Sequence, residues 1–192
     1  YFTLIALAVA GMMLSNFYAL FIGSALMLLL FAGHFSDPAM RRKWKTLIPG
    51  YLVMIAGIIL FLADTIPPQD YGYAHIWHSD IHSLKVWAMF ARLAQVFIPI
   101  PSPNVHFWNT VIYTHPAIQT VLGITITLLI VFVVANHGLA RWFIVFIFVI
   151  LLTFSYFKFN GNQRHNGHLF IAFLALLWIQ KYLPGKETRW QK

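Results

Sequence analysis

The chain has 192 residues, of which 60% are hydrophobic and only 9% are charged, and its formal net charge is +8. About a quarter of the residues are charged in a typical soluble domain, so the composition excludes an ordinary soluble fold and predicts a membrane protein. The absence of cysteine excludes disulfides, thiolate metal sites, covalent c-type haem and a cysteine nucleophile.

The apolar segments predict helices rather than a β-barrel. Barrel strands alternate apolar and polar residues, whereas the runs LGITITLLIVFVVA and WFIVFIFVILLTFSYF are continuously apolar. In lipid, only helices and closed barrels satisfy the hydrogen bonds of their own backbone. We therefore predict an all-α fold, a polytopic integral membrane bundle with about five transmembrane helices and one interfacial amphipathic helix, in a single domain.

The first predicted span covers residues 2–33. As one helix it would be about 48 Å long, against a hydrocarbon core of about 30 Å, so we expect a tilted helix that begins outside the membrane. The alternative is two helices with a break near Ser15 and Asn16. Because the chain begins with Tyr1 rather than Met, we also expect it to be a piece of a longer protein.

The second predicted span covers residues 46–63 and follows a short basic loop, HFSDPAMRRKWK. Pro49 is tolerated in the first turn of such a helix. Residues 64–115 form a long segment that does not span. Within it we expect an amphipathic helix over 79–97, lying in the membrane interface. Its expected apolar face carries Leu84, Trp87, Phe90, Ala91 and Ala94, with Lys85, Arg92 and Gln95 elsewhere. Together with the histidines and acids of the outer side, Arg92 or Arg164 could bind an anionic headgroup.

The remaining predicted spans are 116–135, 139–157 and 163–183. The unbroken apolar part of the last one, residues 169–179, is too short to cross a bilayer. The helix must therefore begin near Gln163, which places polar and charged residues in its first turns. Ionisable residues at this depth are costly, and they suggest a functional site.

The distribution of basic residues predicts the orientation. Nine of the thirteen Lys and Arg fall on one side if the 34–45 loop, the 136–141 loop and the C-terminal tail share that side. These nine are Arg41, Arg42, Lys43, Lys45, Arg141, Lys181, Lys186, Arg189 and Lys192. The positive-inside rule makes that side cytoplasmic, so the 64–115 segment and the 158–168 turn face outward. We expect a bacterial inner membrane.

A first candidate site is the histidine cluster in HIWHSDIH. On a helix, His75, His78 and His82 would share a face, and His78 with His82 has the i, i+4 spacing that binds zinc or copper. No glutamate completes the metalloprotease motif HExxH. The alternative is a set of interfacial residues at the start of the amphipathic helix. Asp80 lies in the same cluster as a candidate base.

A second candidate site is Arg164, His165 and His168 at the start of the last span. One helical turn separates Arg164 from His168. The guanidinium would bind two phosphate oxygens and the imidazole would donate a third hydrogen bond. The alternative is an ordinary anchor to lipid headgroups at a helix end.

Haem is a less favoured cofactor. A b-haem with two imidazole ligands needs two histidines at equal depth on different helices, and the pairs are His34 with His137 or His115 with His168. None of these histidines lies inside an apolar stretch, where buried haem ligands belong.

The stretch FKFNGNQRHNGHLFIAFLALLW, with HFWNT upstream, resembles the C-terminal part of certain multi-span bacterial membrane proteins. Those proteins carry an aromatic-Lys pair, a Gly and then Arg-His-x-Gly between their last two spans. The resemblance implies a topology and a preceding N-terminal part, and no activity. More loosely, an outward Arg-His at the start of a late span is similar to multi-span polyprenyl-phosphate-dependent glycosyltransferases. Their catalytic Asp in the first outer loop has no recognisable counterpart here.

Two classes of function follow. In the first, the chain is a non-catalytic subunit of a larger membrane complex and contacts lipids and other subunits. In the second, it is an enzyme acting on a lipid-linked or anionic substrate. Arg164 would then hold the phosphate, His165 or His168 would act as acid or base, and the cluster around Asp80 would supply a base or a metal site. Nucleic acid is not an expected partner, because the basic residues flank apolar spans.

Overall fold

The computed structural model describes residues 1–65, 83–103, 111–134, 138–157 and 163–179, and the side chains of 83–85 and 163–165 lie outside that description. Every regular element in the described residues is a helix, which confirms the predicted all-α class. The helices are α1 (Phe2–Met13), α2 (Phe17–Ser36), α3 (Pro38–Arg42), α4 (Trp44–Thr65), α5 (Ser83–Phe97), α6 (Pro116–Val134), α7 (Gly138–Phe157) and α8 (Gln163–Ile179).

Four of these helices, α2, α4, α6 and α7, are long and apolar enough to cross a membrane. The chain is therefore a multi-pass integral membrane protein. The helix predicted over 46–63 begins two residues earlier and ends two residues later. The fifth predicted span corresponds to α8, which has 17 described residues. Its predicted end near residue 183 lies outside the described residues.

The prediction of a single helix over residues 2–33 is wrong, because the chain breaks at the polar pair Ser15 and Asn16. The Asn16 side chain accepts a hydrogen bond from the Ala19 amide at 2.9 Å and caps α2. The Ser15 hydroxyl donates to the Met12 carbonyl at 2.8 Å and closes the end of α1. Ser and Asn compete with helical hydrogen bonds and favour such caps.

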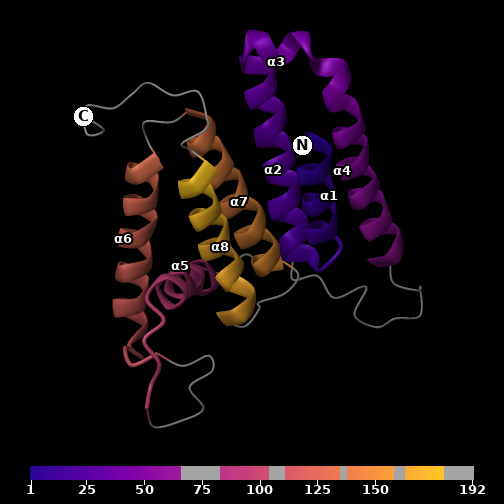
Figure 1. The fold of residues 1–192 in the computed structure, drawn as a ribbon. Helices are drawn as coiled ribbons and strands as arrows, with labels where there is room; N and C mark the ends of the chain where they lie inside the picture. Colours follow the sequence, from indigo (N-terminus) through magenta and orange to yellow (C-terminus); the bar gives the residue numbers. More distant parts are fainter. Residues whose placement is uncertain (66–82, 104–110, 135–137, 158–162, 180–192) are drawn as a thin grey trace.

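α1 is a short helix of 12 residues that packs between α2 and α4 (Figure 1). At about 18 Å it cannot cross the hydrocarbon core. Two glycines of α4 allow α1 to pack closely against α4. A Cβ at Gly50 would meet the Phe2 ring, and one at Gly57 would meet the Ala10 backbone. Small residues permit this kind of backbone approach between membrane helices.

The helix ends fall into two groups, which we call the basic end and the polar end. The basic end comprises the C-terminus of α2, α3, the N-terminus of α4 and the ends of α6 and α7 near 134–138 (Figure 1). The polar end comprises the helix ends at Phe17, Thr65, Pro116, Phe157 and Gln163. α2 and α7 are antiparallel, since the Phe17 ring stacks on Phe154 near the polar end. The 34–45 loop and the ends of α6 and α7 near 134–138 lie at one end, as the orientation prediction requires. The C-terminal tail lies outside the described residues, and the topology and the side that faces the cytoplasm stay predictions.

The apolar interior is divided into two clusters, and α2 contributes to both. One cluster joins α1, α2 and α4 around Met13, Leu20 and Met54. The other joins α2 with α5, α6, α7 and α8. The fully buried Ile147 on α7 and Leu176 on α8 belong to the second cluster. Side chains on opposite faces of α2 therefore hold the two halves of the bundle together.

The predicted amphipathic helix exists, as α5. Figure 1 shows α5 nearly end-on, with α6 on one side and α8 on the other. Leu93 and Ala94 are fully buried, and the Phe97 ring meets Phe170 and Phe173 of α8. The C-terminal half of α5 is therefore covered by helices, whereas Val86 and Trp87 in its N-terminal half are exposed. Its position in the membrane interface stays a prediction.

Hydrogen bonds tie the C-terminal half of α5 to the start of α6. The Tyr113 hydroxyl lies 2.9 Å from the Ala94 carbonyl, which also accepts from the Ile98 amide, and 2.5 Å from the Ile98 carbonyl just after the end of α5. Gln95 donates to Gln119 of α6 at 3.2 Å, and Gln119 donates to the Tyr113 carbonyl at 2.8 Å. These contacts fix α5 against α6.

We expect Gly123→Ala to destabilise the protein, because a Cβ at this position of α6 would overlap the Phe90 carbonyl of α5. Overpacking of this kind costs about 1–3 kcal/mol. The control is Gly11→Ala in α1, where a Cβ meets nothing within 4 Å. The free energy of unfolding in detergent should fall for Gly123→Ala and stay level or rise for Gly11→Ala. An equal response of the two variants would contradict the close crossing of α5 and α6.

Candidate functional site

Four polar side chains from four helices meet near the polar end of the bundle. They are Tyr18 of α2, Arg92 of α5, Ser155 of α7 and His168 of α8. We call this group the polar cluster. Tyr18 and Ser155 are buried, with exposed fractions of 5% and 3%. Buried polar groups in a membrane bundle are costly unless they are hydrogen-bonded, so their convergence indicates a specific role.

Tyr18 is the centre of the polar cluster. Its ring stacks on the His168 imidazole, with centroids 5.1 Å apart and an interplanar angle of 20°. The Phe154 ring meets it edge-on at 5.8 Å. Its hydroxyl faces Ser155 and is coupled electrostatically to Arg92. Tyr18 therefore links α2 to the three other helices of the cluster.

Arg92 is the cation of the polar cluster. Within the described residues, one terminal nitrogen of its guanidinium is buried and has no hydrogen-bond partner. Burial lowers the pKa of Arg92 and the neighbouring Tyr18 raises it, but an arginine stays protonated in proteins. A buried charge without compensation costs several kcal/mol. An anion bound at this nitrogen would supply the missing partner.

The polar cluster lies close to the helix ends. Tyr18 is the second residue of α2, Ser155 is two residues from the end of α7, and His168 is the sixth residue of α8. At 1.5 Å per residue, all three lie within about 8 Å of the end of their helix. A group at the depth of lipid phosphates or just below them is therefore within reach of Arg92.

Of the three site residues predicted around the last span, His168 belongs to the polar cluster. Arg164 and His165 lie in the first turn of α8, and their side chains are outside the described residues. His168 therefore packs against Tyr18, and the roles of Arg164, His165 and His168 as a site stay predictions.

The predicted metal cluster of His75, His78 and His82, together with Asp80, falls in residues 66–82, which are outside the described residues. In the part of the chain that is described, no three His, Asp or Glu side chains come together as a metal site would require. The zinc or copper prediction is therefore neither supported nor contradicted.

The histidines considered for haem have other surroundings where they are described. The His34 ring lies 2.7 Å from the Tyr51 hydroxyl and packs edge-on against Phe2. Its expected partner His137 lies outside the described residues. His115 is exposed, whereas His168 is stacked on Tyr18. Neither pair is seen facing across an apolar cavity in the described residues.

The sequence analysis missed Tyr18 and Ser155, and it named Arg92 as a possible anion ligand without linking it to either residue. It placed Arg92 outside the apolar face of an interfacial helix, whereas α6 and α8 cover both sides of α5. The available signal was a lone arginine within the apolar stretch AMFARLAQVF. Tyr18 and Ser155 each lie in an apolar run, and nothing in the local sequence indicates that they face each other.

No protein-family model matches the chain, and no match was found among curated proteins or solved structures. The likeness to multi-span bacterial membrane proteins therefore remains a prediction from one motif, whose Arg-His-x-Gly residues begin at Arg164 in α8. The polar cluster is the basis on which we propose a function.

The stacking of His168 on Tyr18 predicts a measurable coupling between α8 and α2. His168→Ala should lower the free energy of unfolding by about 1 kcal/mol, because an aromatic pair contributes roughly that much. His168→Phe keeps a ring in place and should recover most of the loss. A double-mutant cycle with Tyr18→Leu measures the coupling directly. A coupling energy of zero would show that the two rings do not interact.

Proposed function

We propose that the chain is an integral membrane protein that binds the anionic group of a lipid or lipid-linked molecule at its polar end, with Arg92 as the binding cation. The observation that carries this proposal is the buried guanidinium nitrogen of Arg92, which has no hydrogen-bond partner among the described residues. Proteins rarely retain a buried cation without compensation, because removing the charge from water is expensive.

The chemistry of the polar cluster favours a phosphate. A guanidinium presents a planar set of donors that matches two oxygens of a phosphate or carboxylate. The hydroxyls of Tyr18 and Ser155 lie on the same side of the bundle, and each is able to donate a hydrogen bond. A phosphate has enough acceptor oxygens to satisfy several such donors at once.

The location of the polar cluster favours a lipid-borne ligand. The polar cluster lies near the polar end of the bundle. Between the cluster and the basic end, the helices present large apolar side chains to the membrane. Examples of such exposed side chains are Leu128 and Phe132 of α6 and Val149 of α7. A molecule with a charged head and a hydrocarbon tail satisfies both surroundings.

A catalytic role is an extension of the same proposal. His168 stacks on Tyr18 next to Arg92, so its imidazole is close to the place where an anionic group would bind. Imidazole titrates near neutral pH and serves as a general acid or base. In a catalytic role, Arg92 would bind the phosphate, as the sequence analysis expected of Arg164. Arg164 and His165, in the first turn of α8, would assist Arg92. The reaction itself is left unassigned.

The second proposal is that the chain is a subunit of a larger membrane complex. Of the four long helices, α6 has the smallest buried share, and its packing within the described residues is mainly against α5. Its exposed apolar face offers a surface for a neighbouring membrane helix. Under this proposal the face of α6, rather than Arg92, determines assembly.

The binding proposal predicts that a prenyl phosphate stabilises the purified chain. A ligand at 100 times its Kd stabilises the folded state by about 2.7 kcal/mol, so farnesyl phosphate should raise the Tm by several degrees. Farnesol, which lacks the phosphate, should not. In the Arg92→Met variant, which keeps the volume and removes the charge, the shift should disappear.

The control for this experiment is Arg141→Met, which removes an exposed cation at the basic end and should keep the full shift. An equal shift with farnesol, or a shift that survives Arg92→Met, would show that the polar cluster does not bind the anion. The subunit proposal is tested separately, by measuring the size of the assembly with light scattering. If the face of α6 determines assembly, the Arg92→Met variant should form an assembly of the same size as the unsubstituted chain.

A further inference from the structure

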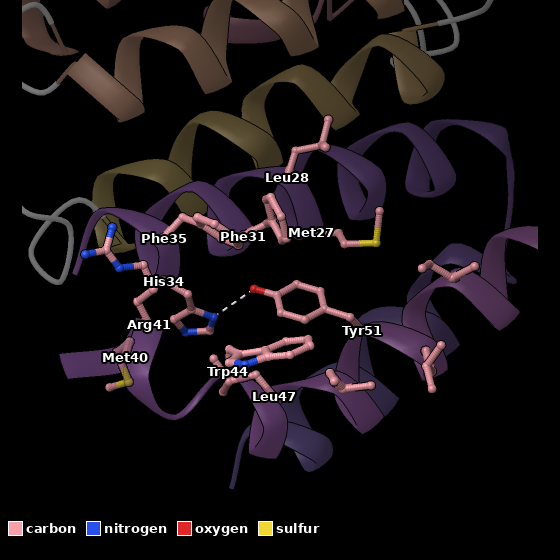
Figure 2. Close-up of a pocket in the computed structure, with 13 residues that line it drawn as sticks. Met27, Leu28, Phe31, His34, Phe35, Met40, Arg41, Trp44, Leu47 and Tyr51 are labelled. Atoms are coloured by element: carbon pink, nitrogen blue, oxygen red, sulfur yellow. Dashed lines mark hydrogen bonds between the residues drawn. The ribbon is translucent and has the colours of Figure 1, made fainter. Parts of the chain in front are cut away.

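A second feature of the molecule lies at the basic end, away from the polar cluster. There, α2, α3 and α4 line a groove of about 370 Å³ (Figure 2). This volume lies within the range of specific small-molecule sites. Its walls are formed by residues of α2, α3 and α4: Met27, Leu28, Phe31, His34, Phe35, Met40, Arg41, Trp44, Leu47, Ile48, Tyr51, Leu52 and Ile55.

The interior of the groove is effectively apolar. Two polar side chains of the lining, His34 and Tyr51, satisfy each other through a hydrogen bond of 2.7 Å across the groove (Figure 2). The Phe2 ring of α1 supports this pair, with its centroid 5.1 Å from each of their rings. Neither polar group therefore needs a ligand, and the walls are suited to hydrocarbon.

Arg41 is the charged residue of the groove lining, and it lies at the α3 end (Figure 2). It belongs to an exposed group of four cations on α3 and the start of α4: Arg41, Arg42, Lys43 and Lys45. Asp37 is the one acid between residues 34 and 45, and it is engaged as the N-cap of α3. The mouth of the groove is therefore strongly positive, and its interior is apolar.

The length of the groove matches one membrane leaflet. Along α4 it extends from Trp44 to Ile55, which is about 16 Å at 1.5 Å per residue. Half of a hydrocarbon core of about 30 Å is about 15 Å. An acyl chain lying in the groove would therefore place its headgroup beside Arg41 and its end near the middle of the bilayer.

We propose that the groove between α2 and α4 is a binding site for one anionic phospholipid, whose acyl chain lies along the groove and whose phosphate is bound by Arg41. Basic pockets between membrane helices recognise anionic headgroups in this way. The site is independent of the polar cluster, because it lies at the other end of the bundle and shares no residue with it.

The experiment uses the full chain reconstituted in phosphatidylcholine bilayers that contain phosphatidylglycerol. Trp44 lines the groove and is half exposed, so lipids with brominated acyl chains quench its fluorescence when they occupy the groove. The fluorescence of Trp44 is obtained by subtracting the fluorescence of the Trp44→Phe variant from that of the unsubstituted chain. Brominated phosphatidylglycerol should displace phosphatidylcholine at Trp44 with a preference of about fivefold or more, since each cation near the surface contributes roughly that factor.

Two matched pairs of variants test the two halves of the site. Arg41→Gln should lower the preference about fivefold, whereas Arg141→Gln, at an exposed arginine outside the groove lining, should leave it nearly unchanged. Leu52→Phe fills the groove and should lower quenching by both lipids. Leu60→Phe is its control, because Leu52 and Leu60 are both on α4 and both 59% exposed, and only Leu52 lines the groove.

Loss of the preference in both arginine variants would show general attraction to a basic surface and would overturn the site. Equal quenching by the two lipids in the unsubstituted chain would overturn it as well, and so would suppression of the preference by inorganic phosphate. Circular dichroism and size-exclusion chromatography identify any variant that fails to fold. Arg92→Met should leave the Trp44 preference intact, so failure of this proposal and failure of the proposal for the polar cluster are distinguishable.

Discussion

The close crossing of α5 and α6 is the contact on which the arrangement of the polar end depends. A glycine at position 123 lets the α6 backbone approach the Phe90 carbonyl so closely that no Cβ would fit between them. The Tyr113 hydroxyl and the Gln95–Gln119 hydrogen bond then hold the C-terminal half of α5 in that position. Because α5 is held among other helices, Arg92 lies inside the bundle rather than in water.

The cations at the two ends of the bundle differ in their exposure to solvent. At the basic end, the cations of α3 and the start of α4 are exposed. At the polar end, a guanidinium nitrogen of Arg92 is buried between helices, beside Tyr18. A desolvated cation interacts more strongly with an anion that reaches it than an exposed cation does. This difference is why the polar cluster is the basis of the proposed function.

α1 has a structural role that its length alone does not suggest. It is too short to span, yet Gly50 and Gly57 of α4 allow it to pack closely, and its Phe2 ring supports the hydrogen-bonded pair of His34 and Tyr51. Behind the groove, α1 therefore fills the space between α2 and α4. The same packing joins α1 to α2 through the buried Met13.

The sequence by itself determined the all-α membrane class, because apolar runs such as residues 116–135 can satisfy their backbone in lipid only as helices. It also predicted polar and charged residues in the first turns of α8, and their role as a site stays a prediction. Only the tertiary structure decided that residues 2–33 form two helices and that Tyr18 meets Arg92 and Ser155. The physical reason is that hydropathy measures how a residue interacts with lipid or water. It does not measure which other helix covers that residue, and the polar cluster depends on contacts between four helices that are far apart in the chain.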